Sequence, residues 1–369
     1  MTARVDFLYT NIGRGHPHYL DGVIECLPPE CVGTVTDVFA ETSGLARAAW
    51  RLARSVYRGG GRSSALSAAY NRLRARADYN RGGLLQGVMG RPLRRRYADD
   101  PLPLVVAHPI LAAILREKRN LFYQHGELAA PRESWVVGRH RTIVPTTATA
   151  DAFIAGGIDA ESLFVSGLCI ESALVRQAEA ALNARLERLG GSGPLCGAFF
   201  SSGAEPRRHV ESLAAAAASV AAAGGRALVF ARRAGRLMAR LAGARREAPA
   251  ITLCLYDRRQ ELNRLTQSYF ADFDYFVAPA HERTHWALGL GLPMIVVGPS
   301  LGSFSPLNRE LLLAQRVAAT IDDGHAAASF GATLGKLREI GELRAMAEAG
   351  WGRYDTRGFQ NTADMLLTS

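Results

Sequence analysis

The sequence predicts an α/β protein of two domains, each built on a parallel β-sheet with helices packed around it. Short apolar runs such as Val5 to Tyr9 alternate with stretches of helical character along the chain. The fully apolar run Met294 to Val297 is typical of a buried parallel strand. Residues Tyr275 to Leu313 give the order strand, loop, helix, strand, loop and helix, which is a βαβ unit.

Length and composition set the size and class of the protein. With 369 residues the chain exceeds one hydrophobic core, so we expect an N-terminal domain of residues 1–170 and a C-terminal domain of residues 171–369. Apolar residues make up 48% and charged residues 21%, which excludes a disordered chain. The five cysteines are odd in number and lack metal-finger spacing, so we expect free thiols.

The sequence predicts a cytoplasmic protein. A peripheral position on the inner face of the plasma membrane is the alternative. No apolar run reaches the roughly 18 residues that a transmembrane helix needs. The N-terminus enters a strand directly, without the basic and apolar regions of a secretory signal.

In the first half, a glycine-rich turn follows the first strand. This turn is Asn11-Ile12-Gly13-Arg14-Gly15-His16, and it leads into a helix. Glycines let the backbone approach a ligand, and a helix N-terminus favours negative charge. Five strands are expected here: Val5–Tyr9, Val32–Val38, Leu104–Ala107, Leu121–Tyr123 and Arg141–Val144. A helix is expected from Ala148 to Gly156.

An arginine-rich segment, residues 42–97, lies between the second and third strands. From Arg47 to Arg96 it holds thirteen arginines and one acid, Asp78. Its apolar residues have the spacing of amphipathic helices. Such a segment can lie on an anionic membrane surface, or it can be a solvated helical insertion packed on its own domain. We do not expect nucleic acid as a partner, because no aromatic-stacking motif or helix-turn-helix signature accompanies the arginines.

In the second half, five strands and five helices are expected. The strands are Leu195–Phe200, Leu228–Ala231, Ile251–Tyr256, Tyr275–Ala278 and Met294–Val297. The helices are Glu205–Ala223, Leu262–Ala271, His281–Leu290, Asn308–Val317 and Thr362–Leu367. In open α/β sheets of this kind, ligands bind at the carboxyl ends of the strands.

Two stretches carry a family resemblance. Pro279 to Pro293 aligns without a gap to the pattern P-G-G-x-T-x-x-E-A-L-x-x-G-L-P, and the loop that ends in His16 fits G-x-G-H. These motifs resemble those of the GT-B glycosyltransferases that act on lipid acceptors. That group includes the diacylglycerol glycosyltransferases and the N-acetylglucosaminyl transferase of peptidoglycan synthesis. The matching donor-motif residues are Pro279, Ala287, Leu288, Gly291, Leu292 and Pro293.

The resemblance implies a fold and a reaction. The fold would be two Rossmann-like domains (GT-B) facing across a cleft, with the last helix crossing back to the first domain. The reaction would move a sugar from a nucleotide-sugar donor, such as a UDP-sugar, to a hydroxyl of a lipid or other hydrophobic acceptor, with inversion. His16 would be the catalytic base. We expect no metal and no other cofactor.

The resemblance also implies two sets of site residues. On the acceptor side they are Gly13, Gly15, His108, His125 and Glu127, where His108-Pro109 resembles the family's S/T-H-P. On the donor side they are Gly203, Arg232, His281, Glu282, Thr284, Ser303 and Asn308. Helix N-termini near Gly203 and Ser303 would hold the departing diphosphate.

The polar centre of the donor motif departs from the family. Arg283 stands at the family's Thr, and Trp286 stands at the Glu that binds the ribose, so we expect Glu282 to take over that contact. Two alternatives follow. One is a GT-B scaffold that has lost catalysis and binds a ligand or partner. The other is a zinc hydrolase, because His281-Glu282-Arg283-Thr284-His285 is also an H-E-x-x-H motif.

Overall fold

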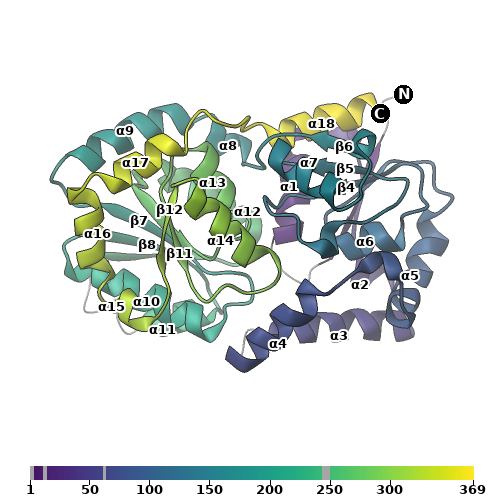
Figure 1. Ribbon diagram of the computed structural model, residues 1–369, viewed down its shortest axis with the longest axis horizontal. Coiled ribbons are helices and arrows are strands. Elements are labelled where there is room, and N and C mark those ends of the chain that lie inside the picture. The colour runs from purple at the N-terminus through teal and green to yellow at the C-terminus, as the bar shows by residue number, and fades with distance from the viewer. Residues whose placement is uncertain (1–3, 11–14, 61–63, 243–249) are drawn as a thin grey trace. The chain divides into compact units, whose positions relative to one another are not determined.

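The computed structural model describes residues 4–10, 15–60, 64–242 and 250–369. The chain divides into two units, each with a six-stranded parallel sheet (Figure 1). The first unit comprises Met1–Ser172, Gly302–Phe304 and Asp355–Ser369, and the second comprises Ala173–Leu301 and Ser305–Tyr354. The predicted α/β class with two parallel sheets is confirmed.

The sheet of the first unit has the strand order β2-β1-β3-β4-β5-β6. All five residues of β1 are buried, because helices cover both faces of a parallel sheet. The chain builds to one side of β1 with β2 and then crosses back to β3, so the order reverses between β1 and β3. The strands are β1 (Val5–Tyr9), β2 (Val32–Asp37), β3 (Leu104–Val106), β4 (Leu121–Gln124), β5 (Arg141–Val144) and β6 (Leu163–Val165).

The arginine-rich segment of the first unit is helical, as predicted. Its helix α3 packs on both α4 and α5, and α5 also packs on α6. The C-terminal helix α18 packs on α1 and belongs to the first unit. The helices are α1 (Gly15–Cys26), η1 (Pro29–Cys31), α2 (Val38–Glu41), α3 (Gly44–Gly60), α4 (Ser64–Ala75), η2 (Tyr79–Arg81), α5 (Leu84–Tyr97), α6 (Pro109–Ile114), η3 (Arg132–Ser134), α7 (Thr147–Ala155), η4 (Ala160–Ser162) and α18 (Gly358–Thr368).

The sheet of the second unit has the strand order β12-β11-β10-β7-β8-β9. Here the order reverses between β7 and β10. All four residues of β11 are buried, as its apolar sequence predicted. The strands are β7 (Cys196–Phe200), β8 (Arg226–Arg232), β9 (Ile251–Tyr256), β10 (Tyr275–Ala278), β11 (Met294–Val297) and β12 (Ala318–Ile321).

The helices of the second unit cover its sheet, and α10 packs on β8, α11, α15 and α16. The alanines of α10 let it lie close to the sheet, and Ala214, Ala216 and Ala217 are buried there. The helices are α8 (Ser172–Val175), α9 (Ala178–Gly190), α10 (Arg207–Ala222), α11 (Arg236–Leu241), α12 (Arg259–Tyr269), η6 (Phe270–Asp272), α13 (Thr284–Gly289), α14 (Phe304–Ala314), α15 (Gly324–Ala328), α16 (Phe330–Glu339) and α17 (Glu342–Ala349).

The predicted helices have different bounds in the structure. The helix expected from Asn308 to Val317 begins earlier, at Phe304, and ends at Ala314. It ends there because Arg316 adopts a left-handed φ of 58°. The amides of Arg316 and Val317 then bond back to the carbonyls of Leu313 and Leu312, at 3.0 and 3.2 Å. A left-handed residue at a helix end is usually glycine. Because this position holds Arg316, the end of the helix could not be predicted from the sequence.

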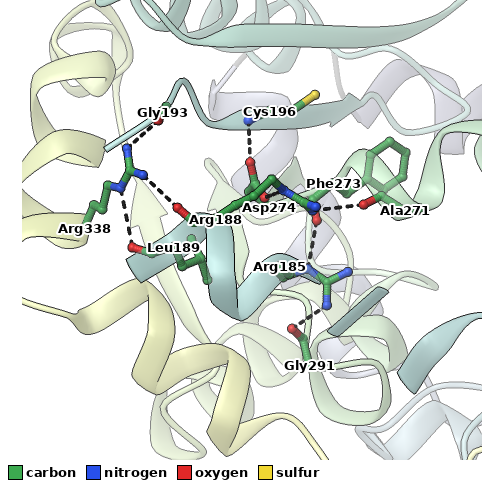
Figure 2. A network of polar contacts seen from close by, with 10 residues as sticks. All are labelled: Arg185, Arg188, Leu189, Gly193, Cys196, Ala271, Phe273, Asp274, Gly291 and Arg338. Atoms are coloured by element: carbon green, nitrogen blue, oxygen red, sulfur yellow. Dashed lines mark hydrogen bonds and ion pairs between the residues drawn. The ribbon is translucent and has the colours of Figure 1, made fainter. Parts of the chain in front are cut away.

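Two arginines of α9, of which Arg185 is fully buried, tie the second unit together (Figure 2). Arg185 of α9 is fully buried and donates to the carbonyls of Phe273, Leu290 and Gly291 at 2.8 to 3.0 Å. Three residues on, Arg188 pairs with Asp274 at 2.6 Å, and Asp274 also accepts from the amide of Cys196. These contacts link α9 to the end of α13 and to both central strands, β7 and β10.

None of the helices in the described ranges is long and apolar enough to cross a membrane.

Candidate active site

Each sheet has one edge where its topology predicts a ligand. In doubly wound sheets, ligands bind at the carboxyl ends of the strands where the strand order reverses. In the first unit this place lies beyond β1 and β3, and in the second it lies beyond β7 and β10. Most of the candidate residues follow these four strands.

His16 and His108 come together at the edge of the first sheet. His16 is the second residue of α1, and His108 follows β3 and caps α6. Their ring centroids are 4.4 Å apart, and the ring planes are tilted by 48°. Gly15 is the first residue of α1, whereas Gly13 lies outside the described residues.

Hydrogen bonds fix the tautomer of His16. Its Nδ1 lies 2.7 Å from the carbonyl oxygen of Ala107. A carbonyl oxygen only accepts, so Nδ1 carries the hydrogen and Nε2 is the basic nitrogen. His16 therefore has the form that a general base requires.

His108 has the opposite tautomer. Its Nδ1 accepts from the backbone amide of Ile110 at 3.2 Å, so the hydrogen of the neutral ring is on Nε2. The ring is 5% exposed. Burial, and then the charges of His16 and Arg74, hold the pKa of His108 well below its usual range. His108 is therefore a neutral hydrogen-bond donor at neutral pH.

His125 and Glu127 follow β4 and are buried. The Nδ1 of His125 lies 3.1 Å from the hydroxyl of Tyr123, and its Nε2 donates to the carbonyl of Ala129 at 3.1 Å. With both nitrogens bonded within the protein, His125 supports the loop after β4. The carboxylate of Glu127 helps to raise the pKa of Tyr123, for which burial is the main cause.

An ion pair that the sequence analysis missed lies at this edge. Arg74 of α4 bonds the buried carboxylate of Glu133 at 2.8 Å and the hydroxyl of Tyr79 at 3.0 Å. Glu133 also accepts from the hydroxyl of Ser303, which belongs to the first unit and was expected on the donor side. The segment holds thirteen arginines, and nothing in its pattern distinguishes Arg74 as the one that is mostly buried and paired with Glu133.

At the edge of the second sheet, the loop after β10 differs from the predicted helix. The helix α13 begins at Thr284, so the expectation that it starts at His281 is wrong. The amide of Thr284 bonds the carbonyl of His281 at 3.0 Å, which makes residues 281–284 a turn. His281 and His285 therefore do not share a helical face, and His285 is fully buried. In the described ranges, no group of three or more His, Cys, Asp or Glu side chains could hold a metal ion.

The departures from the donor motif form one buried cluster. Trp286 is 1% exposed and packs against Phe200 and Phe276, with ring centroids 5.6 and 5.7 Å apart. Arg283 lies over the ring of Phe200 at 4.3 Å and bonds the carboxylate of Glu282 at 2.8 Å. Arg283 therefore holds the carboxylate that was expected to bind a ribose.

The remaining donor-side candidates are divided between the loops and the protein interior. Gly203 lies in a turn four residues before α10, and Arg232 is the exposed last residue of β8. Thr284 and Asn308 are fully buried, and the amide of Asn308 donates to the carbonyl of Ala280 at 3.3 Å. Asn308 thus fixes the loop after β10.

His209, the third residue of α10, was not predicted. It is 1% exposed, and its Nε2 donates to the carbonyl of Pro299 at 2.7 Å. Burial is the main cause that lowers the pKa of His209 to about 4, despite that hydrogen bond, and the charge of His281 lowers it further.

Two of the buried histidines, His140 and His209, predict acid sensitivity. Burial lowers the pKa of His140 to about 4 as well. Their unfolded pKa values are about 6.5, so the unfolded chain binds more protons between pH 6.5 and 4, and the free energy of unfolding falls as the pH falls. Each histidine accounts for up to about 3 kcal/mol of this loss.

Denaturation midpoints measured from pH 7 to pH 4.5 check this expectation. A double variant, His140→Asn with His209→Gln, should show a flatter pH dependence than the wild-type chain. Equal slopes for the two would contradict it.

Comparisons with known proteins identify the fold. The structure is similar to the UDP-GlcNAc 2-epimerase from Neisseria meningitidis bound to UDP-GlcNAc, with a TM-score of 0.60 at 9% identity over 99% of this chain and 98% of that one. A putative UDP-N-acetylglucosamine 2-epimerase from Listeria monocytogenes gives 0.59 at 11% identity over 97% and 94%. Arabidopsis thaliana UGT89C1 complexed with UDP gives 0.51 at 11% identity over 99% and 92%. No family model matches the chain, and no curated protein matches it in sequence. The chain therefore has the GT-B fold, with two Rossmann-like domains.

Proposed function

We propose that this protein is a glycosyltransferase that moves a sugar from a nucleotide-sugar to a hydroxyl of a lipid or other hydrophobic acceptor. The observation that carries the proposal is the hydrogen bond from His16 Nδ1 to the carbonyl of Ala107. It holds the His16 ring by its Nδ1–H, which leaves Nε2 as the nitrogen that can take a proton, where the order of the first sheet reverses. A UDP-sugar as donor is supported by two of the similar structures, one bound to UDP-GlcNAc and the other complexed with UDP.

In the proposed reaction His16 is the general base. Its Nε2 takes the proton of the acceptor hydroxyl while the oxygen attacks the anomeric carbon. The bond between that carbon and the diphosphate breaks, the electron pair leaves with the diphosphate, and the configuration inverts. Neutral His108 adds no second positive charge beside the imidazolium that forms. No step in this scheme uses a metal.

We divide the roles between the two domains. Residues 1–170 bind the acceptor, with Gly15, His108, His125 and Glu127 as acceptor-side residues and Gly13, which lies outside the described residues, as the fifth candidate. Residues 171–369 bind the nucleotide-sugar, with Gly203, Arg232, His281 and Glu282 as ligand contacts and the buried Thr284 and Asn308 as supports of the loop after β10. Arg232 is the exposed last residue of β8, and its positive charge would stabilise the departing diphosphate.

A second candidate is a sugar-nucleotide 2-epimerase. The observation that favours it is the higher TM-scores, 0.60 and 0.59, with two proteins described as UDP-GlcNAc 2-epimerases. Incubation with UDP-GlcNAc and no acceptor separates the candidates. An epimerase converts the sugar under these conditions, and a glycosyltransferase leaves its configuration unchanged.

A third candidate is a GT-B scaffold that has lost catalysis. The ion pair between Glu282 and Arg283 and the buried Trp286 favour it, since they replace the family's ribose-binding carboxylate. Such a scaffold would bind its ligand without turnover with any acceptor.

The donor proposal predicts that Glu282→Ala weakens nucleotide-sugar binding by about 1–3 kcal/mol, the usual value of a charged hydrogen bond. The substitution removes a carboxylate acceptor for a ligand hydroxyl and releases Arg283 from its place. Calorimetry with the best nucleotide-sugar measures the change. Glu179→Ala, at an exposed acid on α9, is the control and should bind like the wild-type chain. Equal affinity of the Glu282 variant would remove Glu282 from the site.

The helical insertion predicts binding to anionic membranes. Leu45, Leu52 and Leu84 are 80%, 57% and 88% exposed, on helices that also carry exposed arginines such as Arg51 and Arg91. Apolar side chains beside cations suit an anionic lipid surface. We expect sedimentation with anionic vesicles at low salt and release as salt rises, because the charges are screened. Equal binding to neutral vesicles, or no binding, would make the segment an ordinary folded insertion.

A further inference from the structure

The two imidazoles at the edge of the first sheet have complementary hydrogen-bonding forms. His16 donates from Nδ1 to the carbonyl of Ala107, which makes its Nε2 an acceptor. His108 accepts at Nδ1 from the amide of Ile110, which makes its Nε2 a donor. The backbone thus sets one acceptor and one donor on neighbouring rings whose centroids are 4.4 Å apart.

A hydroxyl group matches this pair, because it donates one hydrogen bond and accepts others. We propose that His108 is a second catalytic residue, whose Nε2–H binds the oxygen of the acceptor hydroxyl while His16 Nε2 takes the proton. The inference rests on the proposed transferase function. In it, His108 orients the acceptor hydroxyl toward His16. The proton moves from the hydroxyl to His16 Nε2, and His108 keeps its own proton throughout.

The charged surroundings of His108 support this role. The charged groups that act on it are His16 from α1 and Arg74 from α4, and both disfavour an imidazolium at His108. The charge of Arg74 is balanced by Glu133 at 2.8 Å. His108 is therefore kept as a neutral ring with its hydrogen on Nε2, which can donate to a neutral hydroxyl oxygen without competing for its proton.

The structure also explains why His108 cannot serve as the base. Its Nδ1 lone pair is used by the N-terminus of α6, where the amide of Ile110 donates to it. Taking up a second proton there would break the helix cap. The two histidines therefore cannot exchange roles, and each has its own predicted substitution effect.

Two substitutions separate the proposed role from a structural one. In His108→Asn the amide oxygen can accept from Ile110 and keep the cap, but the donor at Nε2 is lost. In His108→Gln the longer amide can place an N–H near the position of Nε2, but the cap is lost. We expect the Asn variant to keep its melting temperature and lose about 10- to 100-fold in kcat/KM. We expect the Gln variant to melt lower and stay within about fivefold of the wild-type activity. The reverse order would show a structural role and overturn the proposal.

A measurement without turnover tests the same proposal. In ¹⁵N NMR spectra at pH 7, the His108 ring should show its hydrogen on Nε2 and the His16 ring its hydrogen on Nδ1. Octyl β-D-glucoside, a hydroxyl-bearing amphiphile, should shift the Nε2 signals of both rings, and octane-1-sulfonate should not. A protonated His108, or a His108 signal that the glucoside leaves unmoved, would overturn the proposal. Because no nucleotide-sugar is present, these outcomes are independent of whether the protein transfers a sugar.

Discussion

His16→Ala is expected to lower kcat by about two to four orders of magnitude and to leave the affinity for the nucleotide-sugar nearly unchanged. The substitution removes the nitrogen that takes the acceptor proton. His16 belongs to the first unit, and the proposed donor contacts are made by residues of the second, so those contacts remain. Single-turnover rates at saturating donor, together with calorimetry of donor binding, measure both parts of the expectation.

A second histidine of the same helix supplies the control for His16. His18 packs against Tyr19 and Phe359, with ring centroids 5.5 and 5.6 Å apart, and lies 3.9 Å from the carboxylate of Glu171. His18→Gln should leave kcat within a few-fold of the wild-type value. An unchanged rate in His16→Ala would remove His16 from the mechanism.

Arg185→Met is expected to lower the free energy of unfolding of the second unit by about 3–5 kcal/mol. Burial lowers the pKa of Arg185 to about 9, so the side chain is still charged at neutral pH. Its guanidinium bonds the carbonyls of Phe273 and Gly291 (Figure 2), and also the carbonyl of Leu290. A methionine fills similar space but leaves all three buried acceptors without this donor.

The loss of the Arg185 hydrogen bonds should destabilise the end of α13 first. Gly291 has a left-handed φ of 54° there, and a side chain at this position would meet Leu182 and the backbone of Ala347. Hydrogen exchange of the amides in α13 and β10 should therefore accelerate in the Met variant before the rest of the unit opens. Arg176→Ala, at an exposed arginine just before α9, is the control, with an expected change within about 0.5 kcal/mol. An unchanged denaturation midpoint in Arg185→Met would show that α9 is not held by this arginine.

The strands of the sheets were largely predictable, because buried parallel strands are short apolar runs between glycine and proline breaks. β1, β5, β9, β10 and β11 have the predicted bounds. β6 and β12 were not predicted. β6 is a run of only three residues, none of them fully buried, and β12 is Ala-Ala-Thr-Ile with two partly buried middle residues, so neither has the long apolar run that marks a central strand.

The helix bounds in the donor region could not be predicted, because they depend on tertiary contacts. Trp286 packs into the aromatic cluster, and Arg283 lies on Phe200, a residue more than eighty positions away in sequence. A local pattern from His281 to Leu290 looks helical throughout, but the turn at residues 281–284 is fixed by these distant neighbours. The pairing of Glu282 with Arg283 was also not predictable, because it depends on the packing of Arg283 against Phe200.

The candidate site was predictable in part. The position of His16 after a glycine-rich turn and that of His108 after a strand follow from sequence order. Their contact follows from the sheet topology, which places β1 beside β3. The pairing of Arg74 with Glu133 joins two segments 59 positions apart, and neither segment signals it.

Nucleotide-sugar binding to the purified chain tests the central claim most directly. Calorimetry with UDP-, GDP- and dTDP-sugars, each titrated to millimolar concentration, measures affinity without any assumption about the acceptor. The account predicts that at least one of them, a UDP-sugar first, binds one equivalent per chain and that Glu282→Ala weakens it. Absence of binding by all three at millimolar concentration would contradict the proposed function.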